Sequence, residues 1–302
     1  MRNAGNGPVP PIVFAVDDNY VPQLCVVVRS LAATNSARLG ELHAIVIHDD
    51  SLGRAQIQRL SWHADDVGLH LELRHTEYRG EGYPLWGWIS PAAYLRLTID
   101  QMLPEYDRAV YVDCDTLVLG DLSPLLHTEL GSSPLAAVQD PLIPVLRCGL
   151  GLPRYKDLGL DGARQYFNSG VLVFNLRWCR ENETLARALH FLRTKPEYVL
   201  FPDQDALNWV ADDDWVRLDA RWNAFPISVI SQLFDPLPCA HEMQSLDVLL
   251  DIEKNARILH YAGPHKPWSD QFPAGAARDR YAAVMREVEA RGPPDHLTSR
   301  LT

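Results

Sequence analysis

Apolar segments of strand length recur along the first quarter of the chain. Residues 12–16 and 44–47 are continuous apolar runs, which are typical of strands buried on both faces of a sheet. Residues 69–74 alternate between apolar and polar side chains, so we expect a half-exposed strand there. These three runs predict the first three strands.

Two stretches with helical spacing separate these strands. The first begins near Pro22, which fits the first turn of a helix, and its apolar stripe consists of Leu24, Val27, Val28 and Leu31. The second is expected to be capped by Ser51 and to end near Gly68. The resulting β-α-β-α-β order is the signature of an open sheet with helices on its faces.

The same alternation continues along the rest of the chain. Further strands are expected at residues 108–112, 116–119, 135–138, 171–174 and 257–261. Helices are expected at residues 92–102, 183–194 and 206–210, followed by a last helix with Tyr281, Val284, Met285 and Val288 inward. Residues 219–256 show no pattern that assigns them.

Two stretches rich in Gly and Pro cannot form regular elements. Residues 76–91 contain Trp86 and Trp88, and a loop that carries two tryptophans favours a pocket lining over a simple cover for the core. Residues 141–165 have the composition of a long loop or lid, a kind of segment that is usually functional or mobile.

Composition and charge narrow the class of partner. The 302 residues suffice for one large α/β domain, or for one domain with an appended lobe, and 47% hydrophobic with 22% charged residues is typical of globular proteins. A formal net charge of -11 argues against nucleic acid and against docking on an anionic membrane. A sugar nucleotide stays compatible, because a bound divalent cation can bring an anion to acidic walls.

The cysteine pattern and the first residues of the sequence indicate the cellular compartment that we expect for the protein. Five cysteines are scattered and never in C-x-x-C spacing, which argues against a zinc site or a disulfide framework and favours a reducing compartment. Residues 1–11 lack the basic start and apolar core of a signal peptide, and no apolar run approaches the ~20 residues of a membrane-spanning helix. We expect a cytoplasmic location.

Ionisable and polar side chains gather where the expected buried strands end. They are Asp17, Asp18, Asn19, Asp113, Asp115, Asp140, His260 and Lys266. In open α/β sheets the ligand lies outside the carboxyl ends of the strands, so these residues can share one crevice. The sequence has no dinucleotide-binding glycine fingerprint, P-loop or nucleophile elbow that would explain such a crevice.

Asp113-Cys114-Asp115 is the candidate metal motif. Two carboxylates this close repel unless a cation lies between them, and an extended backbone would point both the same way. The alternative is a strand end with two solvated turn aspartates. His260 would supply a third ligand, and an imidazole shifts the preference from Mg²⁺ or Ca²⁺ towards Mn²⁺. The alternatives for His260 and Lys266 are a hydrogen-bonded core histidine and an ordinary surface lysine.

Six sequence blocks carry a resemblance to a known family. The chain resembles the family 8 retaining glycosyltransferases, especially the bacterial lipopolysaccharide α-1,4-galactosyltransferases and more distantly glycogenin. The blocks are residues 14–20 (FAVDDNY), 94–97 (YLRL), 111–115 (YVDCD), 167–172 (FNSGVL), 203–208 (DQDALN) and 260–268 (HYAGPHKPW). Together they span nearly the whole chain.

The resemblance implies a fold and a division of the chain. The fold is an α/β GT-A-like open mixed sheet, mostly parallel, with helices on both faces and a small C-terminal helical segment. Residues 1–11 would be a flexible start and residues 269–302 a helix and tail. Residues 12–268 would form the catalytic domain, whose nucleotide-sugar half is about 12–120 and whose acceptor and catalytic half is about 121–268.

The resemblance also implies a UDP-sugar donor, galactose or glucose, and a divalent cation, Mn²⁺ or alternatively Mg²⁺. Metal ligands would be Asp113, Asp115 and His260. Nucleotide-binding residues would be Ala15, Asp17, Asn19, Asp113, Cys114, Asp115, Gly263 and Lys266. Donor-sugar residues would be Arg96, Asp140, Asn168, Asp203 and Gln204, with Gln204 and Asp203 catalytic. Cys114 is expected to pack inward and to act neither as a ligand nor as a nucleophile.

Gln204 is a poor nucleophile where a retaining hydrolase would place a carboxylate. We therefore expect a same-face, internal-return displacement, with a covalent route through Asp203 as the alternative. Other readings are a non-catalytic nucleotide-sugar-binding protein or a metal-dependent hydrolase or nucleotidyltransferase. Residues 292–302 lack the basic, aromatic tail of many bacterial members. The hydroxyl acceptor stays open between a saccharide, a lipo-oligosaccharide and a small natural product.

Overall fold

The computed structural model describes residues 8–78, 82–84, 90–233 and 239–292 of the chain. Its centre is a seven-stranded sheet of order β3-β2-β1-β4-β7-β6-β8, and a separate two-stranded sheet pairs β5 with β9. The strands are β1 (Ile12–Ala15), β2 (His43–His48), β3 (His70–His75), β4 (Arg108–Val112), β5 (Thr116–Val118), β6 (Leu135–Gln139), β7 (Phe167–Asn175), β8 (Val216–Arg217) and β9 (Ile258–His260).

Within the large sheet, β7 runs against its neighbours. The β1–β2, β2–β3, β1–β4 and β6–β8 pairs are parallel, whereas β7 pairs antiparallel with both β4 and β6. The start of β7 therefore lies at the same edge as the ends of β1, β4 and β6. The mostly parallel, mixed sheet expected from the sequence is confirmed.

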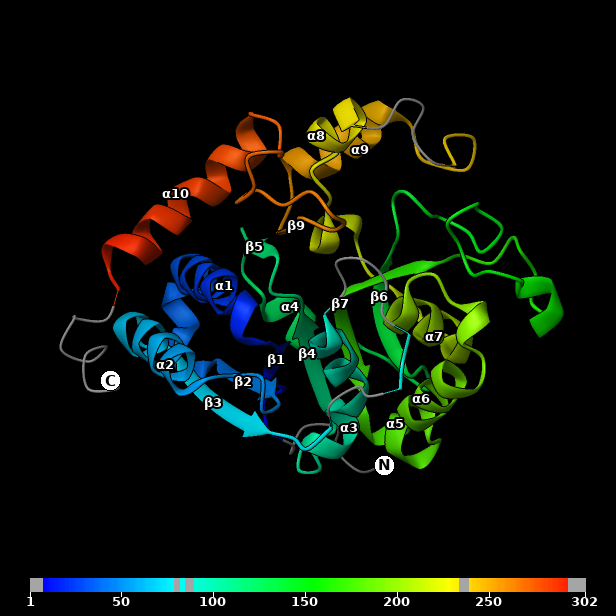
Figure 1. Cartoon of the computed structure of the whole chain (residues 1–302), viewed down its shortest axis with the longest axis horizontal. Helices are drawn as coiled ribbons and strands as arrows, with labels where there is room; N and C mark the ends of the chain where they lie inside the picture. Colours follow the sequence, from blue (N-terminus) through cyan, green and yellow to red (C-terminus); the bar gives the residue numbers. More distant parts are fainter. Residues whose placement is uncertain (1–7, 79–81, 85–89, 234–238, 293–302) are drawn as a thin grey trace.

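Helices cover both faces of this sheet (Figure 1). They are α1 (Val21–Thr34), α2 (Arg54–Val67), α3 (Ile99–Met102), α4 (Ser123–Leu126), α5 (Leu176–Glu181), α6 (Thr184–Thr194), α7 (Pro202–Ala211), α8 (Ile227–Leu233), α9 (Leu246–Lys254) and α10 (Ala276–Ala290). The helix α1 packs against α2, α10 and β5 on one side, while α5, α6 and α7 lie on the other. Among the described residues, no helix is long and apolar enough to cross a membrane.

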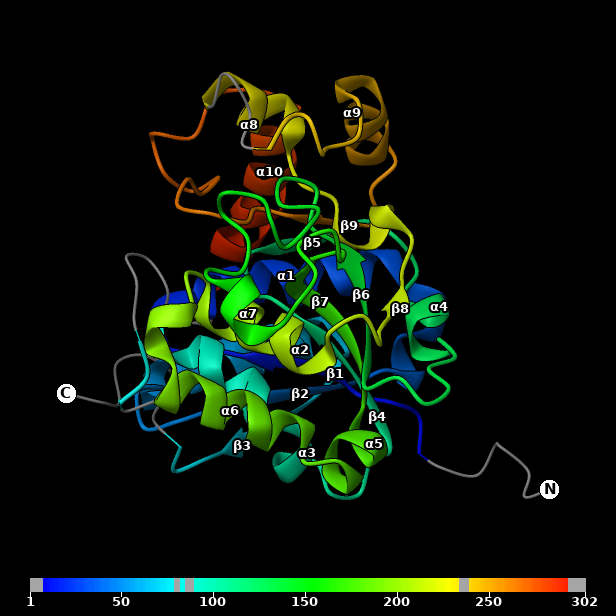
Figure 2. The same cartoon turned by 90° about the vertical axis from the view of Figure 1, so that its right-hand side faces the viewer.

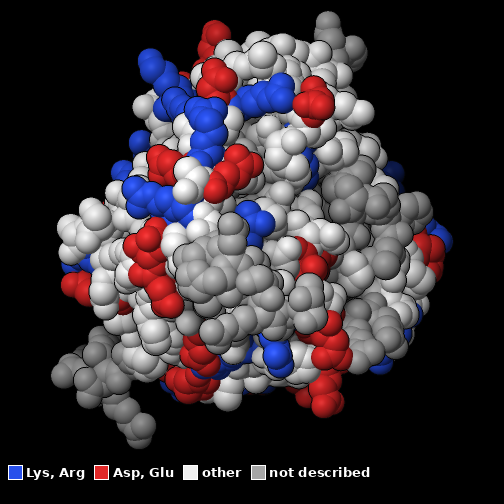
Figure 3. Space-filling model, turned by 60° about the vertical axis from the view of Figure 1, so that its left-hand side comes forward, with Lys and Arg blue, Asp and Glu red and all other residues white. Residues whose placement is uncertain are grey.

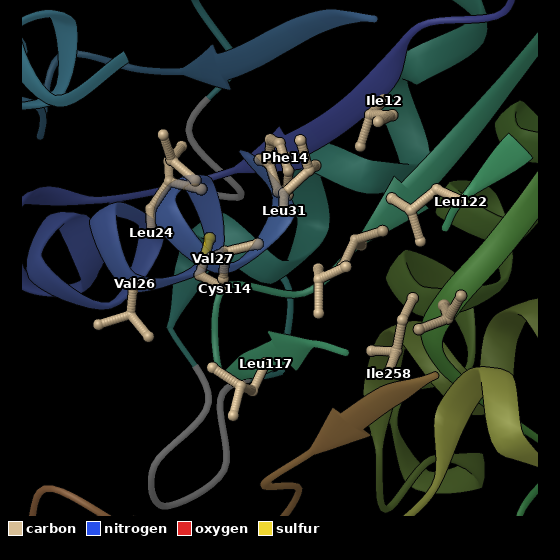
Figure 4. Close-up of a cluster of buried hydrophobic side chains, with 14 of the residues drawn as sticks. Ile12, Phe14, Leu24, Val26, Val27, Leu31, Cys114, Leu117, Leu122 and Ile258 are labelled. Carbon is tan, nitrogen blue, oxygen red and sulfur yellow. The ribbon is translucent and has the colours of Figure 1, made fainter. Parts of the chain in front are cut away.

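The burial of β1 explains its continuous apolar sequence. Ile12 and Phe14 belong to the apolar cluster beneath α1, and Val13 points into the cluster on the opposite face. Figure 4 shows the first cluster, in which Cys114 lies among side chains of α1 such as Val27. The inward packing of Cys114 expected from the sequence is confirmed, since its exposed fraction is 6%.

Four local expectations about element boundaries are wrong. The helix α2 begins at Arg54 with Gly53 as its N-cap, so Ser51 lies in the preceding turn and is no cap. The expected helix over 92–102 is a 3₁₀ helix, Pro91–Thr98, continued by α3. The strand β7 already begins at Phe167, and α7 at Pro202.

The stretches with weak sequence patterns also take definite form. Residues 219–256 hold the 3₁₀ helix Ala220–Asn223, α8 and α9, and Figures 1 and 2 both place α8 and α9 beyond the end of the sheet where β5 and β9 lie. The expected loop over 141–165 carries an apolar cluster of its own, including Ile143 and Leu152. Trp86 and Trp88 lie outside the described residues.

Candidate functional site

A cavity of about 730 Å³ lies at the carboxyl ends of β1, β4 and β6. Ala15 and Asp17 border it after β1, Asp113 after β4, and Asp140 after β6. Asn168 borders it from the start of the antiparallel β7. The expected convergence of strand-end residues is therefore present for all of them except Asp18 and Asn19, which do not line the cavity. The cavity volume is in the usual range of ligand pockets.

Asp113, Asp115 and His260 meet inside this cavity. His260 Nε2 lies 3.7 Å from Asp113 Oδ2 and 3.2 Å from Asp115 Oδ1, and one ligand atom from each residue lies within 4.8 Å of the others. A turn at Cys114 and Asp115 joins β4 to β5 and brings the two carboxylates together. The expectation of an extended backbone is wrong for Cys114 and Asp115, although the two carboxylates converge.

In each aspartate, the carboxylate oxygen that faces away from His260 accepts a hydrogen bond from a positively charged side chain. Asp113 Oδ1 accepts hydrogen bonds from Arg96 Nη2 at 2.7 Å and from the Tyr111 hydroxyl at 2.8 Å. Asp115 Oδ2 accepts from Lys266 Nζ at 2.5 Å. Each carboxylate is thus fixed by one oxygen and presents the other to His260. Such outer contacts orient metal ligands in proteins.

A chain of amides fixes the proton on His260. The backbone N–H of Gly170 donates to Asn168 Oδ1 at 2.9 Å, and Asn223 Nδ2 donates to the same oxygen at 2.8 Å. Asn223 therefore turns its own Oδ1 to His260 Nδ1, 2.8 Å away, which must be the nitrogen that carries the proton. The lone pair of His260 Nε2 then faces the two aspartates, as a metal ligand requires.

Burial and neighbouring charge move the pKa values of the two carboxylates apart. Burial raises the pKa of Asp113, and the Arg96 guanidinium opposes the rise. Burial would also raise the pKa of Asp115, but the Lys266 ammonium holds it well below the usual range. Two carboxylates and a histidine whose ligand atoms lie this close together fit a divalent cation that prefers oxygen and imidazole ligands.

A second network surrounds Asp203 and Gln204 in the first turn of α7. Gln204 Oε1 accepts from Ser169 N at 3.0 Å and from Asn168 Nδ2 at 2.9 Å. Because a backbone N–H can only donate, these bonds fix the orientation of the amide. Asp203 Oδ2 accepts from Ser169 Oγ at 2.9 Å and pairs with Arg96 Nη1 at 3.2 Å. Arg96 thus connects Asp203 with Asp113.

The remaining predicted residues are distributed unevenly around the cavity. Ala15, Asp17, Cys114 and Gly263 line it, whereas Asn19 is exposed and is not among the lining residues. Asp140 lines it as well, with Oδ1 accepting from the N–H groups of Leu142 and Ile143 and Oδ2 from Asn168 Nδ2. Lys266 borders the cavity, but its ammonium donates hydrogen bonds to Asp115 and to the carbonyl oxygen of Tyr261.

Sequence reasoning missed two residues of the site. Asn223 lies in a stretch without an assignable pattern, so nothing indicated that it would contact His260. Ser169 stands inside the block FNSG, but its contacts with Arg96, Asp203 and Gln204 follow only from the fold. An Asn-Ser pair before a glycine at a strand start was the signal that could have pointed to Ser169.

Comparisons with known proteins place this geometry in context. A model described as glycosyl transferase family 8 matches residues 11–271. General stress protein A of Bacillus subtilis is 28% identical over 282 residues, covering 91% of this chain and 92% of the relative. The lipopolysaccharide 1,2-glucosyltransferase of Escherichia coli is 28% identical over 260 residues, covering 85% of this chain and 72% of the relative.

Solved structures show the same likeness. A crystal structure of the galactosyltransferase LgtC in complex with donor and acceptor sugar analogues superposes with a TM-score of 0.75 and 25% identity. The match covers 92% of this chain and 95% of that one. The agreement therefore extends over most of both chains.

Proposed function

The chain belongs to glycosyl transferase family 8, and from that premise we propose that it moves a hexose from a UDP-sugar to an acceptor hydroxyl. The donor we propose is UDP-galactose or UDP-glucose, because the similar proteins include a galactosyltransferase and a lipopolysaccharide glucosyltransferase. The anomeric configuration would be retained, giving an α linkage. The observation that carries the proposal is the Asp113–Asp115–His260 centre inside the large cavity.

The proposed metal ligands are Asp113, Asp115 and His260, and Mn²⁺ is the ion that this donor set favours, with Mg²⁺ as the alternative. When bound, such an ion supplies a positive charge against the negative charge that develops on the leaving diphosphate. Lys266 and Gly263 would contact the same diphosphate. Because Lys266 is paired with Asp115 here, it would exchange this carboxylate for phosphate oxygens.

Ala15, Asp17, Asn19 and Cys114 are proposed for the nucleoside end. Residues 12–120 would form the nucleotide-sugar half and residues 121–268 the acceptor and catalytic half. Arg96, Asp140 and Asn168 are proposed to hold the donor sugar. Their fixed hydrogen bonds support this role, because a pre-oriented polar wall loses little entropy on binding.

For the chemical step we propose internal return on one face of the sugar. Asp203 is tied to Arg96 and Ser169, which disfavours a nucleophilic role and the covalent alternative. Gln204 is held in place by two donors and would place its amide dipole beside the electron-poor anomeric carbon. The acceptor oxygen would bond to the anomeric carbon as the diphosphate leaves with the electron pair and takes the hydroxyl proton.

The proposal is tested by following UDP release from a panel of UDP-sugars. The reaction is run with Mn²⁺ or with EDTA, and with and without candidate acceptors. We expect release from UDP-galactose or UDP-glucose that needs the metal, and an α-linked product by NMR. Tight UDP-sugar binding without turnover for any acceptor would instead favour a non-catalytic binding protein. A β-linked product would contradict retention.

A further inference from the structure

One part of the cavity wall is apolar. Three separate segments form it, and every residue of these segments that lines the cavity, within the described part of the chain, has an apolar side chain. The residues are Leu142, Ile143, Leu150, Leu200, Phe201, Phe225, Pro226, Ile230 and Leu233. The polar lining residues Asp140, Asp203 and Gln204 lie directly before or after two of these segments in the chain. The cavity therefore has two chemically different parts.

Each apolar segment is attached to a residue of the polar network. The N–H groups of Leu142 and Ile143 donate to Asp140 Oδ1, both at 2.9 Å. Phe201 is followed directly by the first turn of α7, which carries Gln204, and its N–H donates to Asp205 Oδ2 at 2.8 Å. The third segment starts at Phe225, whose ring meets that of His260 edge-on, with centroids 5.5 Å apart. The apolar wall therefore lies directly next to the proposed reacting centre.

An apolar wall selects what can lie against it. A free sugar carries hydroxyl groups around its ring, and burying a hydroxyl against carbon without a hydrogen bond is unfavourable. An aromatic ring or alkyl chain would lose nothing there and would gain from leaving water. Phe201 and Phe225 also offer ring faces and edges to another aromatic ring.

We propose that this wall is an acceptor subsite for a molecule that carries its reacting hydroxyl next to an apolar body, such as an aromatic ring or an alkyl chain. The inference rests on the proposed function, because it assigns the acceptor class for the same transfer. The apolar body lies against Leu142, Phe201 and Ile230, and the hydroxyl points to the donor sugar. A small aromatic glycoside and a lipid-linked sugar share this chemistry.

The test measures binding to the protein loaded with Mn²⁺ and UDP. Galactose, phenyl β-galactoside and octyl β-galactoside are titrated by calorimetry, and we expect the better apolar galactoside to have a Kd at least tenfold below that of galactose. A tighter phenyl compound identifies an aromatic body and a tighter octyl compound an alkyl chain. Equal affinity for all three, or tighter binding of galactose, overturns the proposal.

Two substitutions locate the effect in the cavity. Leu150→Asn and Leu233→Asn change lining residues that are partly exposed, so folding tolerates the polar group better than at a buried position. We expect each to lower the affinity ratio of apolar galactoside to galactose at least threefold. Leu246→Asn, at a leucine that is 46% exposed and outside the cavity lining, is the matched control and should keep the ratio.

These outcomes separate the two claims. A protein that fails to bind UDP with Mn²⁺ contradicts the proposed function itself. A protein that binds UDP but shows no preference for the apolar galactosides contradicts the acceptor subsite alone. A preference that Leu150→Asn, Leu233→Asn and Leu246→Asn all leave unaltered means that the apolar compounds bind elsewhere, and this result overturns the subsite too.

Discussion

The side chains around His260 are packed so closely that a neighbouring position has to be glycine. A Cβ atom added to Gly170 would lie 2.2 Å from His260 Cε1 and 2.5 Å from His260 Nδ1. These distances are far shorter than carbon contacts allow, and the Asn223 hydrogen bond keeps the ring from moving freely. The glycine of the FNSG block is therefore a requirement of the candidate metal centre.

Gly170→Ala should displace His260 and lower the affinity for Mn²⁺ at least tenfold, which is the scale of losses when the orientation of a metal ligand is disturbed. Gly40→Ala is the control, because nothing lies within 4 Å of a Cβ atom there. Mn²⁺ affinity is measured by electron paramagnetic resonance on both variants, with circular dichroism to follow the fold. An unchanged affinity in folded Gly170→Ala would contradict a ligand role for His260.

At the proposed reaction centre, Gln204 and Asp203 carry separate predictions. Gln204→Ala removes a group that is held beside the proposed reaction centre, so kcat should fall by about 10²-fold with a smaller change in the KM for the donor. Asp203→Asn removes the partner of Arg96 and should also lower kcat. Full transfer activity in either variant, measured with the donor that the panel identifies, would rule out the role of that residue.

Among the elements, α1 and α2 are joined by a buried cluster that depends on pH. His63 of α2 accepts hydrogen bonds at Nδ1 from Arg29 Nε and Nη2 of α1, at 3.2 and 3.0 Å. Burial, together with the Arg29 charge, lowers the pKa of His63 to about 4. The helices therefore require a neutral His63, since a protonated ring could not accept these bonds.

Because the folded-state pKa of His63 lies below the unfolded value near 6.5, stability should be lost as the pH falls from about 6.5 to 4. The contribution is at most about 3 kcal/mol. His63→Gln keeps a neutral acceptor, so its free energy of unfolding in urea should fall less over this range than that of the wild type. His190→Gln, at an exposed position of α6, should follow the wild type. Parallel curves for all three proteins would contradict this account.

Elements with a strong apolar pattern were the ones that the sequence could predict. The strands β1, β2 and β4 and the start of α1 are confirmed within one or two residues, because their apolar runs must be buried. The start of α2 was mispredicted because its N-cap is Gly53, whose N–H donates to the distant Asp18, a contact that the local sequence does not reveal. The local sequence pattern also could not predict that β7 is antiparallel to its neighbours, since strand direction depends on the long connection before it.

For the whole molecule, the candidate site could be predicted in part because its residues sit at strand ends. Asp113, Asp115 and His260 do meet, but the turn that joins the aspartates and the contact with Asn223 depend on tertiary packing. The apolar wall combines segments that are up to about ninety residues apart, which no local pattern reveals.

On the face shown in Figure 3, acidic side chains are scattered while basic ones gather in its upper part, so the negative net charge forms no single patch there.

The most direct test of the central claim is the calorimetric affinity for UDP in Mn²⁺ and in EDTA, measured for the wild type and for His260→Ala. The account predicts that the wild type binds UDP at least tenfold more tightly with Mn²⁺ than with EDTA. It also predicts that His260→Ala loses most of this difference, because the ion has lost one of its three protein ligands. Equal UDP affinity in Mn²⁺ and EDTA for the wild type would contradict a metal-assisted nucleotide-sugar site.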